Sequence, residues 1–169
     1  ELSNTVNVST TSNLSDTDAT AYTTASSNIA YQYAINDLFK GLKDNSLYTK
    51  IQAFYPFLGT TQAQHKWNAK NPLDTNAAFR LQFFGGGTHS DLGYQCNGTN
   101  AYANTFLVPS AVQNLNSNGL TVAVGTNNGV VGSFSVEIGC SASLTSASFM
   151  SVKLLNTTYN RVLALNTDT

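Results

Sequence analysis

The sequence predicts a mainly β protein, an antiparallel β-sandwich of the jelly-roll type with a short helical lead-in and an extended N-terminal arm. Short apolar segments recur through the second half of the chain, and clusters of turn-forming residues separate them. The clearest example is the apolar segment 77–84, which runs into three glycines, 85–87, and is followed by an Asn-Gly turn at Asn97 and Gly98. Short strands at regular spacing are typical of sandwiches and jelly rolls.

Residues 1–27 are expected to form the extended polar arm. They are nearly all Ser, Thr, Asn, Asp and Ala, and they lack the periodic apolar positions that an independent core requires. Val6 and Val8 alternate with polar residues, which favours one edge strand. We therefore expect this arm to act in assembly and to gain order by packing against a partner subunit.

Residues 28–52 are predicted to be the helical lead-in. Four apolar residues spaced three or four positions apart form one helical stripe: Ile35, Leu38, Phe39 and Leu42. Ser26 or Ser27 can cap the start of this helix, and Lys43 suits the negative end of its dipole. A short second helix is expected at residues 47–51.

Residues 53–169 are predicted to form the β-sandwich domain. Pro56 limits the first segment, 53–58, to a sheet edge or a bulge, because proline has no backbone N–H to donate. The further strand candidates are 77–84, 101–108, 120–125, 130–139, 148–155 and 161–165.

The composition restricts the class of partner. Charged residues make up 10% of the chain and its net charge is −1, whereas soluble domains usually carry about 25% charged residues. The few cations are scattered, so no nucleic-acid partner is expected. The sequence also contains no apolar run long enough for a membrane span. It begins at Glu1 and its only methionine is Met150, so we expect a processed product or a part of a longer chain.

We predict no catalytic residue, no cofactor-binding residue and no metal ligand. Glu137 has no acidic neighbour on its face of the strand, so the paired carboxylates of a glycosidase are missing, and an Asp74–Asp91 pair is the remaining alternative. His65 and His89 lie far apart in the sequence, and His89 is expected to be a loop residue that satisfies backbone groups. The loop residues Asp74, Asn76, Asp91 and Asn97 are expected to stabilise turns rather than bind calcium.

Two further groups of residues carry predictions. Cys96 and Cys140 are a candidate disulfide in an oxidising compartment. Trp67, Tyr94 and Tyr102 are candidates for a glycan-contacting surface, and packing under a loop is the alternative role for Trp67.

The order of these segments resembles the virion structural proteins of tailed bacteriophages that carry a concanavalin A-like or laminin-G-like domain. The resemblance spans roughly residues 30 to 140. Its segments are INDLFKGLK at 35–43, AFYPFLG at 53–59, HKWN at 65–68, NPLD at 71–74, AAFRL at 77–81, FGGGTHS at 84–90, NGTNAYA at 97–103 and VEIG at 136–139.

The resemblance implies a non-enzymatic structural protein of the virion: a capsid decoration protein, a head or tail fibre, or a tail component. Such a protein would act through contacts in a homo-oligomer or with other virion proteins, and host-surface carbohydrate would be a further partner. The alternative is a secreted or surface-displayed lectin-like binding module or a filament subunit. Residues 120–169 supply fewer strands than a full sandwich of this class needs, so the C-terminal part would be shortened or completed by another subunit.

Overall fold

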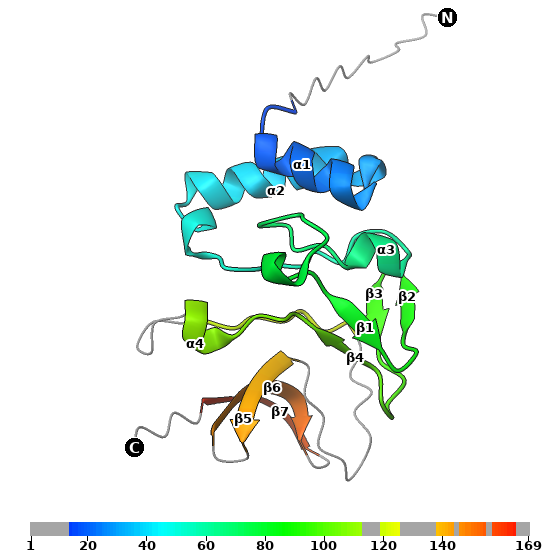
Figure 1. Ribbon diagram of the computed structural model, residues 1–169, viewed down its shortest axis with the longest axis vertical. Coiled ribbons are helices and arrows are strands. Elements are labelled where there is room, and N and C mark those ends of the chain that lie inside the picture. The colour runs from blue at the N-terminus through cyan, green and yellow to red at the C-terminus, as the bar shows by residue number, and fades with distance from the viewer. Residues whose placement is uncertain (1–13, 113–118, 126–137, 144–145, 155–156, 165–169) are drawn as a thin grey trace, which may run out of the picture. The chain divides into compact units, whose positions relative to one another are not determined.

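The computed structural model describes residues 14–112, 119–125, 138–143, 146–154 and 157–164 (Figure 1). The chain divides into two compact units. The first, called the helical unit below, comprises Glu1–Phe83, His89–Tyr94 and Ala103–Phe106. The second, called the C-terminal unit, comprises Phe84–Thr88, Gln95–Tyr102 and Leu107–Thr169.

The helical unit opens with helix α1, Thr17–Ser26. Asp16 caps this helix, because its side chain accepts hydrogen bonds from the backbone N–H groups of Asp18 and Ala19, each at 3.0 Å. Tyr22 is 1% exposed, so α1 belongs to the core. The prediction of an extended arm is therefore wrong for residues 14–27, whereas Val6 and Val8 lie outside the described residues.

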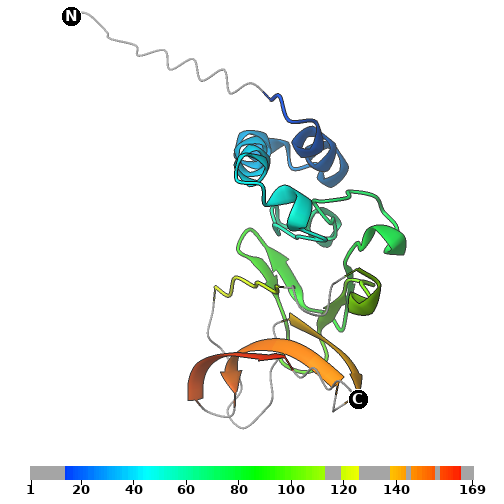
Figure 2. The same ribbon diagram turned by 90° about the vertical axis from the view of Figure 1, so that its left-hand side faces the viewer.

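The apolar stripe predicted at residues 35–42 does form a helix, α2, Gln32–Asp44, after the 3₁₀ turn η1, Ile29–Tyr31. Helices α1 and α2 lie side by side (Figures 1 and 2). A second 3₁₀ turn, η2, Tyr48–Lys50, replaces the expected short helix. The buried core of this unit consists of Ala19, Tyr22, Ile35, Phe39 and Ala69, with Tyr48, Phe54, Leu58 and Trp67 packed against it.

The segment after η2 is irregular where a strand was expected at 53–58. The N–H of Phe54 donates to the side-chain oxygen of Asn68 at 3.2 Å, and its carbonyl accepts from the N–H of Ala69 at 2.9 Å. These loop contacts satisfy backbone groups that a sheet would otherwise pair. Helix α3, Gln62–His65, and the 3₁₀ turn η3, Asn76–Ala78, follow.

The strands are short. In one two-stranded sheet β1, Gln82–Phe84, pairs with β4, Tyr102–Asn104, and in another β2, Thr88–Ser90, pairs with β3, Gly93–Gln95. Helix α4 spans Pro109–Val112. In the C-terminal unit β5, Ile138–Ser143, β6, Ser146–Leu154, and β7, Thr157–Ala164, form an antiparallel sheet in that order (Figure 2).

The predicted β-sandwich is therefore wrong: helices form much of the described fold, and its strands make only small sheets of two or three strands. Left-handed residues interrupt the expected strands. Phe79, at φ 60°, follows η3 inside the segment 77–84, and Phe106, at φ 56°, lies inside the segment 101–108. Residues 120–125 form no strand, and most of 130–139 lies outside the described residues.

A histidine pair as the candidate functional site

Helix α3 and the loop before it position the first residue of the site. Thr61 caps α3, and Gln64 accepts from the N–H of Thr60 at 2.9 Å while donating to the side chain of Asn28 at 3.2 Å. Gly59 has a φ of 96°, and a Cβ there would lie 2.5 Å from the Gln64 side chain. Only glycine fits this turn, which delivers its carbonyl to His65 at the end of α3.

His65 and His89 face each other through their Nδ1 atoms, which are 2.9 Å apart. His65 is 1% exposed, and His89, the middle residue of β2, is half-buried. Nε2 of His65 lies 3.1 Å from the carbonyl oxygen of Gly59. The pair links α3 to β2 within the helical unit.

The hydrogen-bond partners determine the tautomer of both rings. A carbonyl oxygen only accepts, so Nε2 of His65 carries a hydrogen and donates it to Gly59. In neutral His65 the Nδ1 atom is then an acceptor, and Nδ1 of His89 must donate to it. Because neutral His89 carries its hydrogen on Nδ1, its Nε2 atom carries none and is an acceptor.

Aromatic rings surround the pair. Phe57 meets His65 edge-on with ring centroids 5.5 Å apart, and Phe83 meets His89 edge-on at 4.5 Å. Tyr94, from β3, lies 4.8 Å from His89. Burial among these rings lowers the pKa of His89 below its ordinary value of 6.5, and the neighbouring charge of a protonated His65 lowers it further. The site therefore favours the neutral form of His89.

Two imidazoles do not by themselves hold a metal ion. A structural zinc site needs four ligands and a catalytic one three, and across the described residues no three His, Cys, Asp or Glu side chains converge. The chemistry that this geometry does support is the uptake and release of protons. No spacing in the sequence indicates the pair, because its members lie 24 residues apart. His89 is a strand residue bound to a side chain and not the expected loop residue.

The three candidate glycan-contacting aromatics belong to different contact sets. Trp67 packs against the core of the helical unit, and its indole N–H donates to Ala63 at 2.8 Å. Tyr94 lies in the aromatic shell of the histidine pair. In the C-terminal unit Tyr102 is 55% exposed and stacks on Phe84 at 4.9 Å. A glycan surface that uses these residues stays a prediction.

The predicted disulfide also stays a prediction. Cys96 is exposed. Cys140 lies in β5, and its side chain falls outside the described part of the structure.

The polar loop residues stabilise turns and form ion pairs. Asp74 accepts from Lys66 at 2.5 Å and lies 3.5 Å from Arg80. In the C-terminal unit Asn97 organises its turn, because its Oδ1 accepts from the N–H groups of residues 99, 100 and 101 at 3.0–3.1 Å. The turn role expected for these residues is thus seen at Asn97, whereas Asp74 forms ion pairs.

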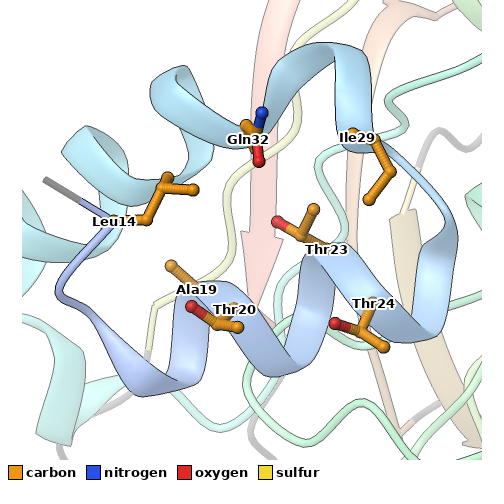
Figure 3. A pocket seen from close by; sticks show the side chains of 7 residues that line it. All are labelled: Leu14, Ala19, Thr20, Thr23, Thr24, Ile29 and Gln32. Carbon is orange, nitrogen blue, oxygen red and sulfur yellow. The ribbon is translucent and has the colours of Figure 1, made fainter. Parts of the chain in front are cut away.

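The helical unit has a small surface hollow beside α1 (Figure 3). Its volume is about 90 Å³, whereas pockets for small molecules hold about 300–1,000 Å³. The lining side chains are Leu14, Ala19, Thr20, Thr23, Thr24, Ile29 and Gln32. The hollow is too small for a substrate or a cofactor.

Comparison with known proteins adds no relative: no family, no curated protein and no solved structure matches this chain. Among the residues that the structure describes, no helix is both long and apolar enough to cross a membrane.

Proposed function

We propose that this chain is a non-enzymatic structural subunit of a tailed-bacteriophage virion, which acts through contacts with neighbouring subunits. The sequence supports a virion protein by its segment order and by its low charge content of 10%. The structure adds one observation that favours a role in assembly, an exposed apolar face on helix α2.

The apolar face consists of residues at helical spacing on one side of η1 and α2. Tyr31, Ala34, Leu38 and Leu42 follow one another at intervals of three and four residues. Tyr31 is 37% and Leu38 43% exposed. Within α2 the charged residues Asp37, Lys40 and Asp44 fall on another side, and Lys43 is bound to Asp16. The apolar face therefore carries no charge.

An uncharged apolar face of this kind is suited to burial against another subunit. Burying a Leu-sized side chain contributes about 1.5–3 kcal/mol, whereas a charge placed in the same contact would have to be desolvated. Exposed apolar residues in a contiguous set are typical of interaction surfaces. The expected partners are a second copy of this chain or another virion protein.

The test is the mass of the full chain in solution, measured by light scattering over a range of concentrations. We expect a multimer that Leu38→Lys dissociates, because the substitution places a charge inside the contact. Asp37→Lys is the matched control: it adds the same side chain one residue away, on the polar side of α2, and should leave the multimer intact. A chain that is monomeric at all concentrations, or equal effects of the two substitutions, would contradict self-association through this face.

Whether the N-terminal residues contribute to assembly can be tested by truncation, provided that α1 is kept. Removing residues 1–27 would delete α1 and part of the core, so a loss of assembly would only report unfolding. Removing residues 1–13 leaves the cap at Asp16 in place. If the multimer then falls apart, the segment that contains Val6 and Val8 connects the subunits. Detection of the chain by mass spectrometry in purified phage particles tests the virion location separately.

A further inference from the structure

We propose that the His65–His89 pair is an acid-operated latch, which fastens the β2–β3 hairpin to α3 and releases the hairpin when the pair takes up protons. The role is independent of the proposed place in a virion. It rests on the face-to-face geometry of the two imidazoles and on their surroundings.

The closed His65–His89 pair can bind one added proton but not two. In the neutral pair His65 donates to Gly59, His89 donates to His65, and Nε2 of His89 is the acceptor left over. A first proton from solvent adds there, and His89 still donates to His65. The only ring nitrogen left for a second proton is Nδ1 of His65. Its lone pair already accepts the hydrogen of His89. Two N–H groups cannot face each other at 2.9 Å, so the second proton separates the rings.

The described residues around the pair place no carboxylate against the added positive charge. Phe57, Phe83 and Tyr94 are ring contacts of the pair, and none of them carries a carboxylate. The ammonium of Lys66, which follows His65, is bound to Asp74. Asp91 is exposed in the turn after β2. Across the described residues neither imidazole forms an ion pair with a carboxylate.

The β2–β3 hairpin is the element that we expect to open. Strands β2 and β3 have three residues each, and a two-stranded hairpin is marginally stable alone. At its tip Leu92 is 93% exposed and so does little to anchor the turn. The side chains of His89 and Tyr94 provide its ring contacts with α3 and β1. When the histidine contact is lost, the hairpin loses one of the contacts that hold it to α3, which favours its local opening.

Hydrogen exchange on the full-length chain tests the latch. The amides of residues 89–94 are compared at pH 7 and pH 5 after correction for the intrinsic exchange rate. Opening lets the pair take up one proton more than the closed form can hold, so the open population should rise by up to about tenfold per pH unit, or at most about a hundredfold between pH 7 and pH 5. The amides of α2 should stay protected. Equal protection of the hairpin at both pH values would overturn the proposal.

The variant His89→Phe separates the latch from general acid sensitivity. Phenylalanine keeps a ring against Phe83 and Tyr94 but cannot take up a proton, so hairpin protection should become independent of pH between 7 and 5. The chain has only two histidines, so His65 is the one imidazole left in this variant, and its Nδ1 no longer faces an N–H group that protonation would oppose. Acid opening that persists in this variant would contradict the latch.

Nuclear magnetic resonance of the histidine rings in the wild-type chain gives a readout that does not depend on any variant folding. At pH 7 the ¹⁵N shifts should show the hydrogen of His65 on Nε2 and that of His89 on Nδ1. The second protonation should occur at the pH where hairpin protection falls. Two rings that titrate independently, without a change in the hairpin, would also overturn the proposal.

Discussion

Asp16 combines two stabilising contacts at one residue. Its carboxylate caps α1 and also binds the ammonium of Lys43 at 2.7 Å, which joins the start of α1 to the last turn of α2. Burial by itself would raise the pKa of Asp16, but the hydrogen bonds and charge of Lys43 and the backbone N–H donors outweigh burial and lower it.

We expect Asp16→Ala to lower the free energy of unfolding by about 1–2 kcal/mol, because the cap is lost and Lys43 loses one partner. Asp18→Asn is the control. Asp18 also binds Lys43, at 2.6 Å, but its side chain is 47% exposed, and exposed pairs contribute about 0–1 kcal/mol. Urea denaturation of both variants checks the difference. Equal losses would mean that the cap contributes nothing beyond the ion pair.

Among the elements, the turn after β1 depends on the identity of one glycine. Gly85 and Gly86 both have positive φ, 76° and 75°. A Cβ on Gly85 would lie 2.1 Å from the backbone oxygen of Asn100, whereas a Cβ on Gly86 meets nothing within 4 Å. Both substitutions place alanine at a positive φ, so their conformational cost is similar. Only Gly85→Ala also brings a methyl group against the backbone of Asn100.

We therefore expect Gly85→Ala to cost clearly more stability than Gly86→Ala. The shared cost of a left-handed alanine is about 1 kcal/mol, and the clash adds about 1–3 kcal/mol. Thermal unfolding of the two variants, followed by circular dichroism, measures the difference. Similar melting temperatures would show that the turn relaxes to accommodate the methyl group.

The contrast between α1 and α2 explains how much of the fold the sequence could predict. Helix α2 was predictable because apolar residues recur at helical spacing from Ile35 to Leu42, although of this stripe only Ile35 and Phe39 are buried. Helix α1 buries Thr23 and Ser26 beside Ala19 and Tyr22, so its inner face looks polar in the sequence. The strand segment 77–84 was overestimated because a left-handed phenylalanine cannot be recognised from an apolar run. The histidine pair depends on tertiary packing alone, which no local spacing reports.

At the scale of the whole molecule, the titrating groups predict a stability plateau. The folded pKa of His89 lies below 6.5, so the unfolded chain binds more protons as the pH falls through that value, and stability declines. Burial raises the pKa of Tyr22 to about 12 and also raises that of Tyr55, so both phenols contribute stability that is lost above their ordinary value of 10.

We expect the urea midpoint to be highest between about pH 7 and pH 9 and to fall on either side. A further acid decline below about pH 4 should follow, as Asp16 takes up a proton on unfolding. Urea titrations from pH 3 to pH 11 test this profile. A midpoint that stays constant from pH 7 to pH 5 would contradict the assignment of His89 as a neutral, half-buried group.

The position of Trp67 determines which part of the chain tryptophan fluorescence reports on. It is the only tryptophan of the chain, and it packs against the core of the helical unit. Its fluorescence therefore reports on that unit alone, while circular dichroism sums over every helix and strand. If the two signals change together on heating, the two compact units unfold as one cooperative system. If the emission changes at its own temperature, the chain consists of two independently melting parts, and fluorescence alone would miss one of them.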